Sequence, residues 1–156
     1  MKFSRVFLNR LQNEAITSDT VVVIDVLRSF TSAAVALARG ASAIYPMPGI
    51  AAAIALADRI DHSITVGAIA GGDPAPGFAF GNSPSRLMRA NLAGKKIVMS
   101  TAAGVRGLQR FRQARHLYAA SQAVPEERVL ALHVRSFLAG FAATVAEART
   151  FEAVHR

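Results

Sequence analysis

The sequence contains no cysteine. Structural disulfides, thiolate metal sites and a cysteine nucleophile are therefore excluded, and the absence fits a reducing cytoplasm. Long hydrophobic runs are also missing, because charged residues interrupt every stretch before the roughly 18 apolar residues that a membrane helix needs. The first 14 residues lack the apolar core of a secretory signal. We therefore expect a soluble, cytoplasmic protein that makes no membrane contact.

Aromatic and acidic residues are scarce. Aromatic side chains make up 7% of the 156 residues, tryptophan is absent, and 10 acidic residues stand against 18 basic ones, which gives a net charge of +8. Hydrophobic residues nevertheless make up 52% of the chain. A disordered chain is therefore excluded, and residues 1–156 are expected to form a single domain.

Most of the positive charge lies near the C-terminus, where residues 95–156 carry 10 basic and 4 acidic groups. Codon bias explains this excess as well as an anionic ligand does. Arg106 and Arg110 share one helical face, but that face continues through the uncharged Gln113 and Ala114. The basic stripe is short, so we do not expect nucleic acid as a partner.

Short β-branched runs alternate with helical patterns along the chain. Strands are predicted at residues 20–26, 41–47, 63–67, 95–100 and 116–119, the first of them buried on both faces. Helices are predicted at 29–39, 50–59, 84–92 and 101–112. This alternation predicts a three-layer αβα fold with a largely parallel sheet. Residues 124–156 are expected to form a helical tail.

Asp25 and Arg28 lie at the end of the most apolar strand. Ligands of open parallel sheets bind beyond the carboxyl ends of the strands, where helices begin. An acid at the end of an apolar strand is costly unless it is paired or ligated. One interpretation is an ion pair between Asp25 and Arg28. The other makes Asp25 a metal ligand or acid/base and Arg28 a phosphate-binding group.

Two further segments lie at predicted helix starts. Residues 100–104, followed by Arg106, form a strand-to-helix turn that can bind an oxyanion, although an ordinary helix cap explains the same residues. The segment 77–84 places Asn82 and Ser83 at a helix start, and a turn with a cap is again the simpler alternative. The four histidines lack metal-ligand spacing, and GxSxG is absent, so neither a zinc site nor that class of serine hydrolase is expected.

Three segments in this order and spacing resemble the 2-phosphosulfolactate phosphatase family: VVVIDVLRSFTSAAVALARGA, GFAFGNSPSRL and KKIVMSTAAGVRGL. The resemblance covers about residues 15–123. It implies an α/β fold and a magnesium-dependent phosphatase, a phosphoric monoester hydrolase. The implied reaction converts 2-phospho-3-sulfolactate, or a related small phosphorylated acid, to 3-sulfolactate and phosphate.

The resemblance also assigns roles to residues. It implies Asp25, Arg28 and Thr101 as catalytic residues, with Asp25 as the Mg²⁺ ligand. It implies substrate binding by Asn82, Ser83, Ser100, Gly104 and Arg106, with Arg28 and Arg106 neutralising phosphate or sulfonate.

The chain departs from the family pattern at two positions. Ala68 stands where the family has an acid, and Ala103 where it commonly has asparagine. These departures motivate an alternative function, a non-catalytic relative that binds phosphate or another anion. The apolar residues of the tail also predict that it covers an exposed part of the sheet, in its own subunit or in a homodimer.

Overall fold

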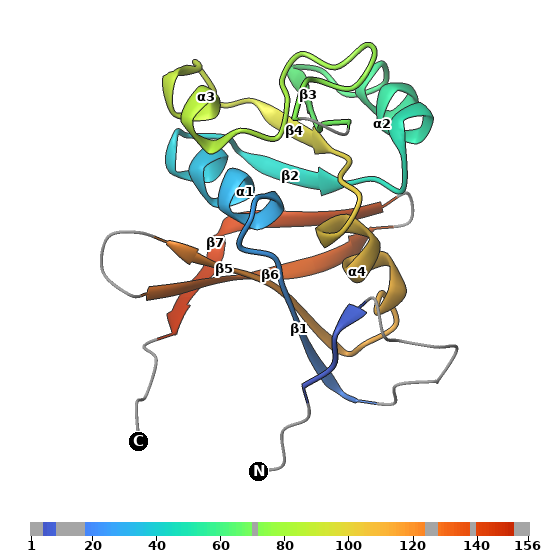
Figure 1. Ribbon diagram of the computed structural model, residues 1–156, viewed down its shortest axis with the longest axis vertical. Coiled ribbons are helices and arrows are strands. Elements are labelled where there is room, and N and C mark those ends of the chain that lie inside the picture. The colour runs from blue at the N-terminus through green and yellow to red at the C-terminus, as the bar shows by residue number, and fades with distance from the viewer. Residues whose placement is uncertain (1–4, 9–17, 70–71, 124–127, 138–139, 152–156) are drawn as a thin grey trace.

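The computed structural model describes residues 5–8, 18–69, 72–123, 128–137 and 140–151, with side chains up to Ser121. Strands and helices alternate from residue 20 to residue 123 (Figure 1). In chain order the elements are β1 (Thr20–Ile24), α1 (Ser29–Ala38), β2 (Ala43–Pro46), α2 (Ile50–Ala57), β3 (Ser63–Val66), α3 (Pro84–Arg89), β4 (Lys96–Met99), α4 (Gly104–Arg110), β5 (His116–Ala123), β6 (Arg128–Phe137) and β7 (Gly140–Phe151).

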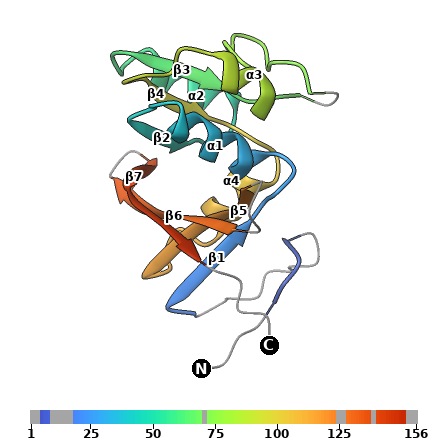
Figure 2. The same cartoon turned by 90° about the vertical axis from the view of Figure 1, so that its left-hand side faces the viewer.

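The strands of the described residues form one sheet in the order β1-β5-β6-β7-β2-β4-β3. β1 pairs with β5 in parallel, and β4 pairs in parallel with both β2 and β3. The antiparallel ladders all involve β6 or β7. Figure 2 shows the two parallel groups at opposite ends of the molecule, with β6 and β7 between them. The α/β class with parallel strands is confirmed for the part of the chain before residue 124.

The C-terminal helical tail predicted for residues 124–156 is wrong wherever the structure describes it, because β6 and β7 are strands. An apolar run does not by itself distinguish a helix from a buried strand. β5 continues to Ala123, beyond the predicted end at residue 119, and β6 pairs with it from Tyr118 to Ala123. This pairing provides hydrogen-bond partners for backbone N–H and C=O groups that would otherwise be unpaired at the edge of β5.

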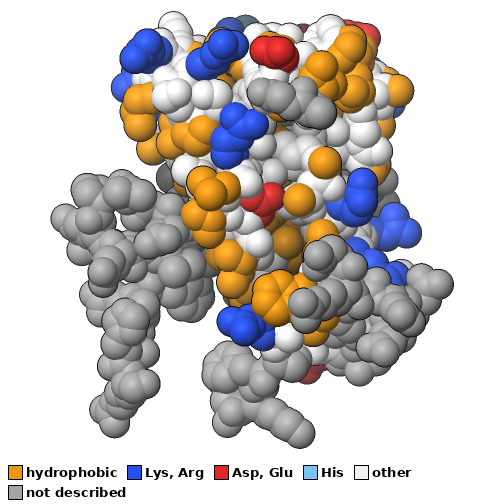
Figure 3. Space-filling model, in the orientation of Figure 1, with side chains coloured by type: hydrophobic (Ala, Val, Ile, Leu, Met, Phe, Trp, Pro, Cys, Tyr) orange, Lys and Arg blue, Asp and Glu red, His pale blue; other side chains and the backbone are white. Residues whose placement is uncertain are grey.

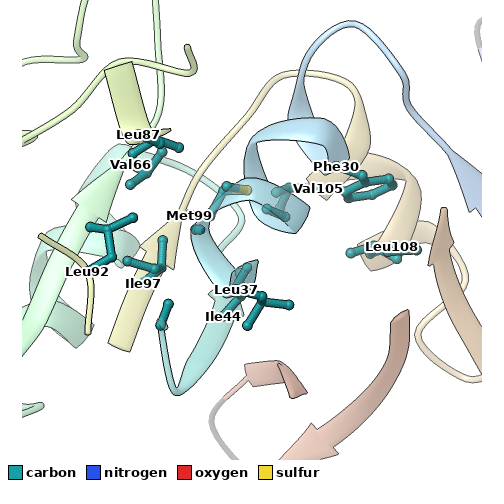
Figure 4. Packing of buried hydrophobic residues seen from close by; sticks show 14 of the residues in the cluster. Phe30, Leu37, Ile44, Val66, Leu87, Leu92, Ile97, Met99, Val105 and Leu108 are labelled. Atoms are coloured by element: carbon teal, nitrogen blue, oxygen red, sulfur yellow. The ribbon is translucent and has the colours of Figure 1, made fainter. Parts of the chain in front are cut away.

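Side chains of β4 alternate between two hydrophobic clusters, which places helices on both faces of the sheet. Ile97 and Met99 belong to the larger cluster, formed with residues of α1, α3 and α4 (Figure 4). Val98 points to the other face, where it packs with Ala53 of α2 and with Phe78. The three-layer arrangement predicted from the sequence is therefore confirmed.

The end of α1 shows how the sequence fixes an element boundary. The N–H of Gly40 bonds to the carbonyl of Leu37 (2.9 Å), and that of Ala41 bonds to the carbonyl of Ala36 (3.0 Å). This is a Schellman arrangement, and Gly40 adopts the φ of 90° that it requires.

No helix among the described residues is long and apolar enough to cross a membrane.

β1 is less buried than its sequence predicts. Val22 is 49% exposed and Ile24 is 67% exposed, whereas Val21 and Val23 pack against the core. β1 lies at one edge of the sheet, and both α1 and α4 pack on the face that Val21 and Val23 share. The prediction of a strand buried on both faces is therefore wrong, because an uninterrupted β-branched run does not reveal which face stays open.

Candidate functional site

Asp25 lies just beyond the carboxyl end of β1. Its backbone N–H extends the pairing with β5 by bonding to the carbonyl of Ala120 (3.1 Å). Its side chain, half-buried, turns toward the start of α1 and accepts a hydrogen bond at Oδ1 from the backbone N–H of Ser29 (3.3 Å). The carboxylate thus accepts a hydrogen bond from an N–H group of the first helical turn, where a negative charge is favourable.

Ser29 connects this helix start to the end of β4. Its side chain is 2% exposed, and its Oγ donates a hydrogen bond to Oγ1 of Thr101 (2.6 Å). Thr101 Oγ1 also accepts the backbone N–H of Val105 in α4 (3.3 Å). Residues 72 positions apart in the sequence are therefore joined by one hydroxyl pair.

Gly104, the first residue of α4, lets this helix approach α1 closely. A Cβ atom placed on Gly104 would lie 2.7 Å from Ser29 Cβ and 2.9 Å from Asp25 Oδ2. Real Cβ atoms do not approach other atoms so closely, so the position requires glycine. The structure thus brings together Asp25, Thr101 and Gly104, three of the predicted site residues.

Arg28 and the segment around Asn82 meet at a second point, the turn at Gly72. The guanidinium of Arg28 lies 2.9 Å (Nη2) from the place where a Cβ of Gly72 would be, and Gly72 has a φ of 95°. A Cβ on Gly81 would lie 2.7 Å from the carbonyl oxygen of the same Gly72. The φ of Gly72 and the backbone contact of Gly81 favour glycine at both positions, and the Arg28 guanidinium lies against this turn.

Asn82 is 8% exposed, and its Oδ1 has no hydrogen-bond partner among the described residues. A buried amide oxygen without a partner is costly, by about 1–3 kcal/mol. Such groups in native proteins call for an explanation, and a hydrogen bond to a ligand or an ordered water would supply one.

Three other predicted residues are less closely connected. Ser83 precedes α3, and its Oγ shares a hydrogen bond with Ser85 Oγ (3.1 Å). Ser100 is half-buried, and its backbone N–H bonds to the carbonyl of Val66 (3.0 Å). Arg106 is exposed on α4. No contact of the described residues joins these side chains to Asp25, and their roles stay predictions.

The carboxylate and hydroxyl oxygens of the cluster suit a hard cation. Among the described residues, no three His, Cys, Asp or Glu side chains gather as a metal site. Mg²⁺ needs no such protein cage, because it usually keeps several waters and binds through one or two carboxylates together with substrate phosphate. The carboxylate of Asp25 beside the hydroxyls of Ser29 and Thr101 is chemically compatible with this mode.

Ser29 and Thr31 lie at the start of the helix predicted at 29–39, and both hydroxyls have partners distant in the sequence. Thr31 Oγ1 donates to the carbonyl of Val26 (2.5 Å), which commits its one proton, so Ser121 Oγ must donate to Thr31 Oγ1. Ser121 directly follows Ala120, the last residue of β5 in the parallel pairing with β1, and is 1% exposed. The only sequence signal was the series of hydroxyl residues that begins four positions after Asp25.

We expect Thr31→Val to lower the free energy of unfolding by about 1–3 kcal/mol, because the buried Ser121 hydroxyl and the Val26 carbonyl lose a partner. Urea denaturation measures this loss. Thr31→Ser keeps the hydroxyl and is the matched control. Equal losses in the two variants would contradict the assigned hydrogen bonds.

Basic side chains are spread over the face of the molecule drawn in Figure 3 instead of gathering in one patch, and acidic ones are few. Arg28 and Arg106 are both exposed. On this face, the described basic side chains give a dispersed positive charge.

Comparison with known proteins agrees with the three motifs. The family model described as 2-phosphosulpholactate phosphatase matches residues 6–124. Proteins named "Probable 2-phosphosulfolactate phosphatase" are similar to the chain: that of Carboxydothermus hydrogenoformans is 44% identical over 65% of this chain and 41% of its own length. The protein of Thermus thermophilus is 38% identical over 66% and 43%, and that of Gloeobacter violaceus is 43% identical over 63% and 42%.

The chain therefore spans less than half the length of these curated relatives. The matched region contains Asp25, Ser29, Thr101 and Gly104, the residues that the structure brings together at the ends of β1 and β4. On the motifs, the fold and this match, the chain belongs to the 2-phosphosulfolactate phosphatase family.

Proposed function

We propose that the protein is a magnesium-dependent phosphatase that hydrolyses 2-phospho-3-sulfolactate, or a related small phosphorylated acid, to the hydroxy acid and phosphate. The observation that carries this proposal is the cluster of Asp25, Ser29 and Thr101 where β1 and β4 end, inside the region matched by the family model. Because the relatives are longer, the activity of the whole protein is carried over as a proposal.

In this proposal each group of the site has a distinct task. When bound, Mg²⁺ would neutralise charge on the phosphoryl group as water attacks phosphorus and the ester oxygen leaves. Asp25 would hold the ion through its carboxylate. The Thr101 hydroxyl would donate to a phosphoryl oxygen, and the exposed guanidinium of Arg28 would pair with phosphate or with the sulfonate. Asn82 Oδ1 offers an acceptor for an ordered water.

The direct test is release of inorganic phosphate from a panel of phosphorylated hydroxy acids, with and without Mg²⁺. We expect the largest release with 2-phospho-3-sulfolactate or a close analogue, and loss of release when the metal is removed by a chelator. Release no greater than that of Asp25→Ala, for every compound, would remove the enzymatic proposal. Saturable binding of phosphate without turnover would support the anion-binding alternative.

We also propose a cytoplasmic location, which is supported by the absence of cysteine.

We further propose that the protein forms a homodimer. Val22, Ile24 and Leu27 expose apolar surface along and just after β1, and adjoining exposed apolar groups are a feature of subunit interfaces. Light scattering at micromolar concentration is expected to give twice the monomer mass. A monomer mass under these conditions would refute the dimer.

A further inference from the structure

The hydrogen bonds of Thr101 determine what its hydroxyl can still do. A threonine hydroxyl has one proton to donate and two lone pairs that accept. Oγ1 of Thr101 accepts from Ser29 Oγ (2.6 Å) and from the backbone N–H of Val105 (3.3 Å). Both lone pairs are engaged, so the hydroxyl of Thr101 can only donate.

Ser29 is held firmly enough to impose this direction. It is 2% exposed, and its backbone N–H is fixed by Oδ1 of Asp25. The backbone of Gly104 packs against its side chain, since a Cβ on Gly104 would lie 2.7 Å from Ser29 Cβ and 2.9 Å from Ser29 Oγ. The side chain of Ser29 therefore cannot change its position unless α1 or α4 also moves.

We propose that Ser29 is a positioning residue, which directs the hydroxyl proton of Thr101 toward an anionic oxygen of the bound phosphoryl group. The inference rests on the proposed function for the location of the phosphoryl group. Ser29 acts through Thr101 and does not itself touch the substrate. A donor whose orientation is fixed before binding costs no reorganisation and selects a group that only accepts, such as a deprotonated phosphoryl oxygen.

The test is a double-mutant cycle on the binding of inorganic phosphate, measured by calorimetry with Mg²⁺ present. We expect Ser29→Ala to weaken phosphate binding about tenfold, because a hydrogen bond to a charged group loses its preferred direction. Thr101→Val is expected to weaken binding by at least as much. In the double variant, Ser29→Ala adds nothing further, because its effect passes through the hydroxyl of Thr101.

Ser32→Ala is the matched control. Ser32 lies on the same helix, is 0% exposed, and its hydroxyl has no hydrogen-bond partner among the described residues. It undergoes the same chemical change as Ser29, so it reports any general effect of removing a buried serine hydroxyl from α1. We expect phosphate binding by Ser32→Ala to equal that of the wild type. Ser29→Cys, with a weaker donor of similar size, is expected to fall between wild type and Ser29→Ala.

Two results would overturn the inference: phosphate affinity unchanged in folded Ser29→Ala, or full additivity of Ser29→Ala and Thr101→Val. Both would give Ser29 a structural role alone. A wild type that does not bind phosphate overturns it as well. A wild type that binds phosphate but hydrolyses no substrate contradicts only the proposed function, since the binding cycle still decides the role of Ser29.

Discussion

Replacing Asp25 by asparagine is expected to lower phosphate release at least about a hundredfold while the protein stays folded. Asparagine has the same shape, and its Oδ1 can still accept the N–H of Ser29. What it lacks is the negative charge that would hold Mg²⁺ beside the phosphoryl group. The measurement is kcat at saturating substrate and Mg²⁺, together with thermal unfolding of both proteins.

Asp58→Asn provides the matched control for this substitution. Asp58 is exposed and directly follows α2, on the face of the sheet opposite α1 and α4. We expect its kcat to remain within a factor of two of the wild type. If Asp25→Asn retained activity to the same degree, Asp25 would have no role in the reaction.

Gly104→Ala is expected to reduce phosphate release and phosphate affinity by at least about tenfold. The added methyl group would lie 2.9 Å from both Asp25 Oδ2 and Ser29 Oγ, so α4 must shift away from both groups. Displacements well below 1 Å are enough to misalign groups that act together on a substrate. The kinetic constants and a phosphate titration measure the effect.

Gly107→Ala separates this local effect from a general loss of stability. Its methyl group would lie 2.6 Å from Val23 Cγ1, also between α4 and β1, but away from Asp25. Both substitutions gain helix propensity, about 1 kcal/mol, and both crowd a buried contact. We expect similar shifts in the melting temperature, with phosphate affinity kept only in Gly107→Ala. Equal losses of affinity would mean that the Gly104 contact has no special role.

Part of the site could be predicted because it follows from topology. Asp25 and Thr101 each come directly after a parallel strand, and parallel strands between helices place such residues where helices start. The predicted helix ranges 29–39 and 84–92 likewise place both ends of α1 and the start of α3 within a few residues.

The hydrogen bond between Ser29 and Thr101 could not be predicted, because it depends on how closely α1 and α4 pack. That distance is fixed by the missing side chain of Gly104, and spacing along the sequence does not reveal such a contact. The region of β6 was predicted as helix for a related reason. Its apolar residues are compatible with the spacing of a helix and with that of a strand. It forms a strand because it pairs with the edge of β5, and the position of that edge depends on the whole sheet.

A crystal structure of the protein with Mn²⁺ in place of Mg²⁺ and with phosphate tests the central claim most directly, because the anomalous signal of manganese locates the cation without ambiguity. The account predicts the metal on the carboxylate of Asp25, and a phosphate oxygen within hydrogen-bond distance of Thr101 Oγ1, with Ser29 still donating to that atom. Metal and phosphate bound together at another place, with Asp25 and Thr101 contacting neither, would contradict it.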